Sequence, residues 1–278
     1  MNHAPLQKDP TLAKMLDETA AYIASVQSLD GCIAWFVGGS ADPWDHIEAA
    51  MGLATSGQID AAKSAYNFLA EQQLANGGWF VTYEQGKPKD TSRVESNFVA
   101  YIATGIWHLY LVTDDKTVLT TYWPMVARAM QLVVSLQGTY GEIYWAIDSE
   151  TGVQEDALVT GCSSIFHSLG CAIAIADTLH APSAMLKQTR QNLKTALTVH
   201  PEAFDRTWES KARYSMDWFY PVLTGVLTGS AALAHIDQRW DEFVVDQLGC
   251  RCVNDQPWVT VAETCELVMA LAVAGDTA

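Results

Sequence analysis

Acidic side chains recur near the start of five apolar segments of the sequence. They are Asp45 and Glu48, Glu95, Glu155 and Asp156, Asp217, and Glu263 with Glu266. A carboxyl group beside apolar surface has a raised pKa because desolvation disfavours its charged form, and nearby acids raise it further. Such groups can serve as a general acid and a general base at neutral pH. We therefore predict a catalytic set of Asp45, Glu95, Glu155, Asp156, Asp217 and Glu263; the alternative role for each is helix capping.

Aromatic and basic side chains accompany these acids. Aromatic faces stack on sugar rings or stabilise developing cations, and a basic group pairs with an acid or with an anionic part of a substrate. The predicted substrate-binding residues are His46, Tyr83, Arg93, Trp145, Trp218 and Trp258. Two alternatives stay open: His46 as a hydrogen-bonded core residue, and Trp145 as a ring that packs a loop onto helix ends.

The elements that position these residues follow from hydrophobic periodicity, which predicts helices and almost no strand. The ten expected segments are 11–27, 43–55, 58–73, 92–112, 115–137, 157–180, 183–199, 216–228, 230–246 and 258–274. Amphipathic segments alternate with segments that are apolar nearly all round. A helix without a polar stripe is buried on both sides, so the apolar segments are predicted as inner helices and the amphipathic ones as outer helices.

The connections between these helices also alternate. Inner-to-outer links are short, whereas outer-to-inner links, such as SLDGCIAWFVGGSAD, are long, aromatic and acidic. Long loops in a compact helical domain are usually functional. The pattern predicts an all-α protein, a single α/α toroid domain over residues 1–278, with long loops and acids at one end. Asp42 is the expected N-cap of the helix at Pro43, and Asp90 or Thr91 that of the helix near Ser92.

A turn is repeated where outer helices end. Its Gln, Gly and Trp are Gln27, Gly31 and Trp35, then Gln73, Gly77 and Trp79, then Gln137, Gly141 and Trp145, with a degraded copy from Gln247 to Trp258. This turn resembles the QW repeat of squalene and oxidosqualene cyclases, and it is similar to turns in the toroid of protein prenyltransferases. The resemblance implies an enzyme that acts by acid–base chemistry on an isoprenoid or another apolar small molecule.

Two further interpretations stay open. The aromatic and acidic stretch IYWAIDSETGVQEDALVTGCSS, ahead of a small-residue helix, is similar to six-hairpin glycosidases, which implies paired carboxylates acting on a neutral glycoside. Squalene and oxidosqualene cyclases protonate their substrates with an Asp-x-Asp-Asp run, which this sequence lacks. A non-catalytic binding or assembly module on the same fold is therefore the third interpretation.

The charge and composition of the chain limit the kinds of molecule that it can bind. The net charge of −16 argues against nucleic acid and anionic membrane surfaces, which need clustered Lys and Arg. Cys250, Cys252 and Cys265 are a weak metal-ligand set, and buried free thiols are the preferred interpretation. We expect no metal, no cofactor, no membrane span, a cytoplasmic location and a small-molecule substrate, since the sequence has no signal-peptide pattern, phosphate loop or dinucleotide motif.

The predicted ring is incomplete. Ten helices end on an unpaired inner helix, whereas toroids of this kind usually have twelve. The apolar faces beside such a gap are exposed, covered by a partner, or covered by a further C-terminal segment. Monomers rarely expose large apolar patches, so a homodimer that buries the gap is the expected arrangement.

Overall fold

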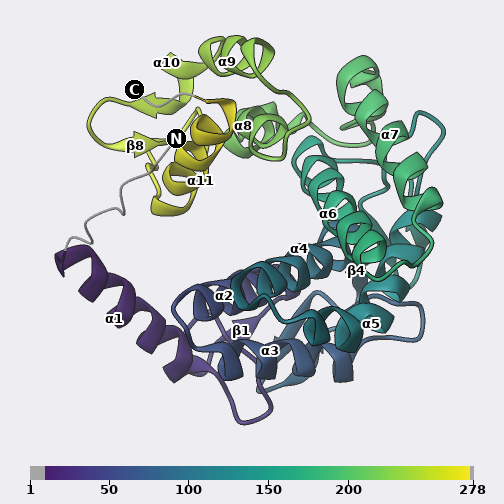
Figure 1. Cartoon of the computed structure of the whole chain (residues 1–278). Helices are drawn as coiled ribbons and strands as arrows, with labels where there is room; N and C mark the ends of the chain where they lie inside the picture. Colours follow the sequence, from purple (N-terminus) through teal and green to yellow (C-terminus); the bar gives the residue numbers. More distant parts are fainter. Residues whose placement is uncertain (1–9, 276–278) are drawn as a thin grey trace.

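The computed structural model describes residues 10–275 and confirms the all-α toroid (Figure 1). Five inner helices pack side by side in chain order: α2 (Pro43–Thr55), α4 (Ser96–Thr113), α6 (Val159–Thr178), α8 (Ser215–Leu223) and α11 (Val261–Ala274). The outer helices are α1 (Pro10–Val26), α3 (Ile59–Gln72), α5 (Lys116–Ser135), α7 (Ala184–Val199) and α9 (Ser230–Asp237), followed by the short α10 (Trp240–Phe243). The hydrophobic periodicity of the sequence therefore predicted both the inner and the outer layer of helices.

Helix α6 shows why the inner helices are so apolar. By length and composition alone, its residues Val159–Thr178 could cross a membrane. However, 61% of its most apolar window is buried inside the structure. Its apolar character is thus accounted for by packing against α4, α7 and α8.

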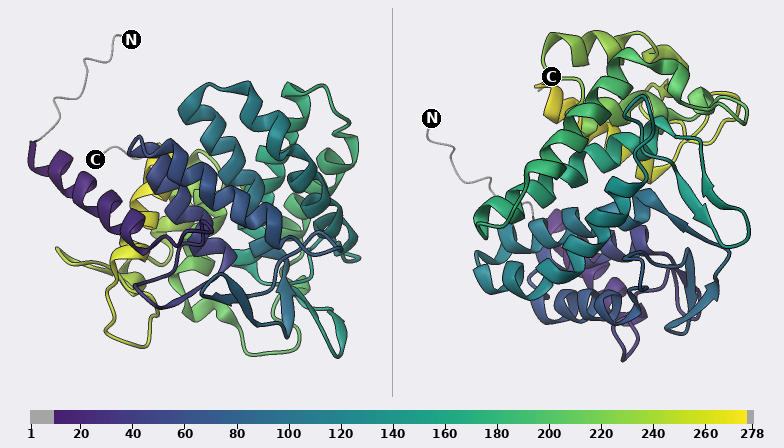
Figure 2. Two further views of the ribbon diagram at one scale, coloured as in Figure 1. Left: turned by 90° about the horizontal axis from the view of Figure 1, so that it is seen from below. Right: turned by 90° about the vertical axis from the view of Figure 1, so that its right-hand side faces the viewer.

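The expectation of almost no strand is wrong for the long loops. These form three small sheets: β1 (Ser40–Ala41), β2 (Thr82–Glu84) and β3 (Lys87–Asp90); β4 (Arg93–Glu95), β5 (Ala146–Asp148) and β6 (Gly152–Gln154); β7 (Val244–Val245) and β8 (Gly249–Cys250). Two 3₁₀ turns, η1 (Pro201–Ala203) and η2 (Lys211–Arg213), precede α8. The hairpins gather at one end of the molecule (Figure 2).

One strand changes a predicted helix boundary. β4 pairs antiparallel with β5, with Glu95 opposite Ala146, so α4 begins at Ser96 instead of near Ser92. Asp90 and Thr91 therefore cannot cap this helix. The expected cap of α2 is present, since the Asp42 carboxylate accepts a hydrogen bond of 3.0 Å from the Asp45 backbone N–H.

The repeated Gln and Gly residues make three equivalent turns, here called the Gln–Gly turns. In each turn the Gln Nε2 donates to the carbonyl oxygen of its own Gly and to a carbonyl of the next outer helix. The pairs are Gln27 with Gly31 and Ala61, Gln73 with Gly77 and Met125, and Gln137 with Gly141 and Thr189, at 2.8–3.0 Å. Each Gln side chain thus joins one outer helix to the next.

The glycines of these turns have no room for a side chain. Gly31, Gly77 and Gly141 have φ values of +93°, +95° and +97°, in the region that favours glycine. A Cβ atom at Gly77 would lie 2.4 Å from the Arg128 carbonyl oxygen. The turn therefore presses directly on the backbone of the neighbouring outer helix.

The tryptophans of the turns do not share one role. Trp79 is buried and donates to the Leu69 carbonyl oxygen at 2.7 Å, whereas Trp35 is half-exposed and donates to Asp42. The degraded fourth copy is not a Gln–Gly turn: Gln247 lies between β7 and β8, and no outer helix ends there. The repeat therefore covers three hairpins.

The described part of the ring is open between α11 and the α1–α2 hairpin (Figure 1). The two helices that border this opening carry exposed apolar side chains: Val261, Val268, Met269 and Val273 on α11, and Met15, Leu16 and Tyr22 on α1. The homodimer expected to cover them stays a prediction.

Asp156 fixes the loop that leads from α7 to α8. Its buried carboxylate accepts hydrogen bonds from the backbone N–H groups of Ala157, Arg206 and Thr207 and from the Thr207 hydroxyl, at 2.6–3.0 Å. Burial alone would raise its pKa, but these hydrogen bonds outweigh burial and the pKa is lowered. Asp156 is thus a structural anion, which corrects its predicted catalytic role.

Gly77→Ala is expected to destabilise the fold by about 3 kcal/mol or more, because it adds a backbone clash to an unfavourable φ. Gly152→Ala is the matched control, since Gly152 has φ +81° with nothing within 4 Å of an added Cβ. It should lose only about 1 kcal/mol. Urea denaturation of both variants tests the difference, and equal losses would show that the close contact with α5 is unimportant.

Asp156→Asn is expected to lower stability at pH 7 by about 2 kcal/mol, since an amide cannot accept from all four donors. The folded-state pKa lies below the ordinary 3.8, so the stabilisation is present above pH 3.8 and lost as pH falls through the folded value. The gap in Tm between wild type and variant should shrink in acid. The exposed Glu155→Gln serves as the control; a gap independent of pH would contradict this role for Asp156.

Candidate active site

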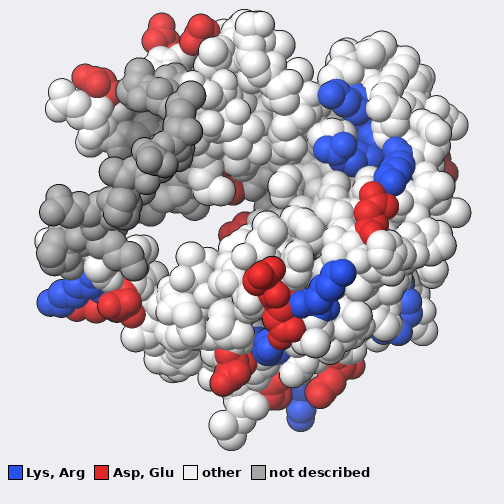
Figure 3. All heavy atoms as spheres, viewed as in Figure 1, with Lys and Arg blue, Asp and Glu red and all other residues white. Residues whose placement is uncertain are grey.

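Three adjoining cavities occupy the loop end of the toroid and its interior. Their volumes are about 210, 280 and 530 Å³. The first two share Trp44, Phe98 and Met216, and the last two share Glu48, Ala262 and Glu266. The molecule is visibly hollowed here, with acidic atoms in the depth of the hollow (Figure 3). The inner helices therefore enclose one continuous site.

The middle cavity contains a cluster of carboxylates. Five acids line it: Asp42, Asp45, Glu48, Glu263 and Glu266. Residues three apart on a helix lie on the same face, which is why the start of α2 and the start of α11 each present a row of acids. In the middle cavity the predicted ring of acids is thus reduced to the starts of two helices, one on each side of the opening.

Two of these acids have pKa values near neutrality. Asp45 keeps solvent access through the open side of the ring, yet desolvation and then the charge of Asp42 raise its pKa to about 7. Desolvation also raises the pKa of Glu266 to about 7, with the Tyr220 hydrogen bond opposing and the charge of Glu48 adding to the shift. Both groups can exchange a proton near pH 7.

Aromatic side chains hold the carboxylates in place. Glu48 accepts from the Trp44 indole at 2.5 Å and from the Tyr101 hydroxyl at 3.1 Å. Tyr220 donates to Glu266 at 2.6 Å. Trp44 stacks on Tyr101, with ring centroids 4.9 Å apart. The acids therefore lie beside a fixed aromatic surface.

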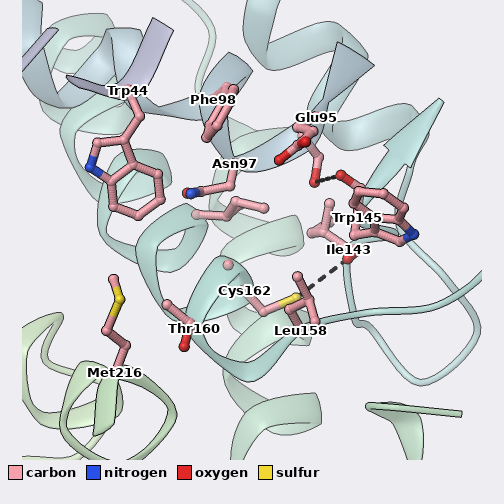
Figure 4. Close-up of a pocket in the computed structure, with 13 residues that line it drawn as sticks. Trp44, Glu95, Asn97, Phe98, Ile143, Trp145, Leu158, Thr160, Cys162 and Met216 are labelled. Carbon is pink, nitrogen blue, oxygen red and sulfur yellow. Dashed lines mark hydrogen bonds between the residues drawn. The ribbon is translucent and has the colours of Figure 1, made fainter. Parts of the chain in front are cut away.

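The smallest cavity adjoins Glu95 (Figure 4). Trp44 and Met216 lie on one side of it, and Glu95 and Trp145 on the other. Burial raises the pKa of Glu95, and its hydrogen bond from Arg93 at 2.7 Å opposes this shift. Arg93 itself does not line this cavity, so it positions Glu95 and does not meet a substrate.

Two other predicted acids do not line the three cavities. Glu155, which follows β6, is exposed and lines none of them. Asp217 lies behind the Glu95 cavity, where its carboxylate accepts from the backbone N–H and the hydroxyl of Thr160. Burial raises the pKa of Asp217. Its observed role is to join the starts of α6 and α8.

His46 and Tyr83 are corrected to core residues. His46 is 1% exposed; its Nδ1 accepts from the Ile33 N–H and its Nε2 donates to the Ala65 carbonyl, both at 3.0 Å. With both ring nitrogens paired and its pKa lowered by burial, it holds α2 to α3 as a neutral ring. Tyr83 is buried against Phe68 and borders a separate cavity near Gly86.

The predicted tryptophans have three different surroundings. Trp145 lines the Glu95 cavity, in agreement with its expected position. Trp218 is buried, stacks on Phe243 and donates to the His235 carbonyl, so it packs α8 against α9 and α10. Trp258 is 58% exposed and lines none of the described cavities. Neither Trp218 nor Trp258 is placed to bind a substrate in this site.

Trp44, Tyr101 and Tyr220 are not predicted from the sequence. Glu48 and Glu266 are named there among the acids but not in the predicted catalytic set, although each follows a predicted acid by three residues and lies one helical turn further into the cavity. No group of three His, Cys, Asp or Glu residues suited to a metal ion occurs within residues 10–275. The six cysteines are free, and Cys265 is exposed.

Comparisons with known proteins place this chain. No protein-family model matches it. It is 46% identical over 259 residues to the MMP endo-(1,4)-3-O-methyl-alpha-D-mannosidase of Mycolicibacterium hassiacum, covering 93% of this chain and 70% of that protein.

Solved structures with the same fold are less similar in sequence. A wild-type glycosidase superposes with a TM-score of 0.72 at 15% identity, over 97% of this chain and 82% of the other. A family 63 mannosylglycerate hydrolase from Thermus thermophilus gives 0.67 at 12% identity, over 94% and 87%. These likenesses support the six-hairpin glycosidase fold.

The predicted terpenoid cyclase or prenyltransferase function is wrong. The similarity of the turns reflects a structural solution for joining outer helices, which unrelated toroids can share, whereas the mannosidase is related along nearly the whole chain. The chain is an enzyme, and it belongs to the glycosidase family of the Mycolicibacterium hassiacum endo-mannosidase.

Proposed function

We propose that this protein is an endo-acting glycoside hydrolase that cuts α-(1,4)-linked 3-O-methylmannose chains. The substrate class comes from the related mannosidase. The observation that carries the proposal is the group of carboxylates on α2 and α11 that lines a single cavity beside Trp44. Paired carboxyl groups and an aromatic surface are what the hydrolysis of a neutral glycoside needs.

The chemistry divides between Asp45 and Glu266. One, protonated, gives its proton to the glycosidic oxygen as the bond from that oxygen to C1 breaks. The other, ionised, takes a proton from the water whose oxygen forms the new bond to C1. One water is consumed and one hydroxyl appears on each product. With both pKa values near 7, each protonation state is available at neutral pH.

Glu48, Trp44 and Tyr101 form the wall on which a sugar ring is bound. The Trp44 indole is fixed by its hydrogen bond to Glu48 and by stacking on Tyr101. A fixed ring loses little conformational entropy on binding, so it is a suitable stacking surface. Hydroxyl groups of the bound sugar then donate hydrogen bonds to the carboxylate oxygens.

Asp45→Asn and Glu266→Gln are each expected to lower kcat by about 10²–10⁴-fold on a defined 3-O-methylmannose oligosaccharide, since neither amide transfers a proton. Glu155→Gln, an exposed acid outside the cavity, is the control and should retain wild-type activity. Product release is measured by chromatography. Full activity in both cavity variants would exclude this pair.

The pH profile provides a second readout. An acid that must be protonated and a base that must be ionised, both near pH 7, give a narrow maximum around pH 7 with activity falling on each side. The rate of wild type is measured from pH 4 to 10. A broad plateau from pH 4 to 6 would show that the essential base is one of the other carboxylates.

A further inference from the structure

The largest of the three cavities extends from the acids into the interior of the toroid. Its deeper wall comes from residues past the first turn of the inner helices, among them Met51, Thr104, Ser164, Leu223 and Met269. We propose that this space, here called the lumen subsite, binds one O-methylated hexose unit, with the Ser164 hydroxyl hydrogen-bonded to the sugar and its methyl group against Met51, Leu223 and Met269. The assignment rests on the proposed function.

Ser164 lines the lumen subsite with an unpaired polar side chain. It is 2% exposed, lines the cavity, and its Oγ has no hydrogen-bond partner. Buried hydroxyl groups are nearly always paired because an unpaired one costs free energy. A sugar hydroxyl or ether oxygen in the cavity would supply the missing partner.

Within residues 10–275, no group of the protein forms a hydrogen bond with the Ser164 hydroxyl. A helical Ser or Thr commonly donates to the carbonyl four residues earlier, as Thr178 does to Ala174 at 2.7 Å in the same helix. Ser164 makes no such bond. The nearby Thr104 hydroxyl is already paired with Ser168 at 3.0 Å. The Ser164 hydroxyl is thus left without a partner inside the described part of the protein.

Another part of the cavity wall is apolar. Met51, Leu223 and Met269 come from α2, α8 and α11 and face the same cavity. A methyl ether has no donor and gains free energy when its carbon leaves water for such a surface. Glu48 and Glu266 belong to both this cavity and the acid cluster, so a sugar in the lumen subsite lies next to the bond being cut.

The first test compares Ser164→Ala with Ser163→Ala. Ser163 is 0% exposed and equally unpaired, but it lines none of the described cavities. KM for the 3-O-methylmannose oligosaccharide should rise about fivefold for Ser164→Ala, the loss of one hydrogen bond, and stay unchanged for Ser163→Ala. Equal KM values in wild type and Ser164→Ala, or equal increases in both variants, would overturn the assignment.

The second test addresses the methyl group through Met269→Gln and Val268→Gln. These neighbours are 58% and 60% exposed, so both variants should fold, but only Met269 faces the lumen subsite. The preference for methyl 3-O-methyl-α-D-mannoside over methyl α-D-mannoside, measured by calorimetric binding, should fall about fourfold in Met269→Gln alone. An unchanged preference in Met269→Gln, or no preference in wild type, would overturn the methyl contact.

The binding measurement separates the two proposals. It does not depend on bond cleavage, so selective binding without hydrolysis would reject the proposed catalytic pair and retain the lumen subsite. Hydrolysis that is insensitive to Ser164→Ala and Met269→Gln would retain the proposed catalytic function and reject the lumen subsite.

Discussion

The toroid depends on one side-chain amide used three times. In each Gln–Gly turn a glutamine Nε2 reaches a carbonyl in its own turn and a carbonyl on the next outer helix. An outer helix has no regular backbone pairing to a neighbouring helix, so this amide and the close approach of the glycine fix the spacing between hairpins. Inner helices placed by that spacing bring distant acids to one cavity.

The position of the acids follows from helix geometry. Asp42 caps α2, and the next acids lie one turn apart on the same face, so all of them line one cavity. The same spacing operates in α11. In this arrangement burial and the charge of neighbouring acids raise the pKa of the carboxyl groups. They can therefore act as acids and bases near neutral pH. Tyr101 and Tyr220 then limit the movement of Glu48 and Glu266.

The sequence could predict the fold and the end of the molecule that holds the site, because periodicity and loop length are local properties. It predicted Asp45 and Glu263 in the acid cluster for the same reason. It could not distinguish Asp156 from these acids, since the four donors to that carboxylate include groups fifty residues away. His46 was mistaken for a binding residue because its two partners lie on another loop and another helix.

The reaction could not be predicted from the sequence for a different reason. A turn that joins outer helices carries no information on what the cavity binds, so similar turns led to the wrong enzyme class. The discriminating residues, such as Trp44, Tyr101 and Glu266, come from three helices and converge only after folding. Their chemistry is a property of the assembled ring.

The span of the glutamine contacts also bears on how the chain is made. The amides of Gln27, Gln73 and Gln137 reach carbonyls only 34, 52 and 52 residues further along the chain. Each link can therefore close as soon as the next outer helix has left the ribosome, before the rest of the chain is made. Assembly can proceed hairpin by hairpin during synthesis, with early apolar faces covered in turn. The cavity cannot form before α11 is in place, since α11 supplies part of its wall.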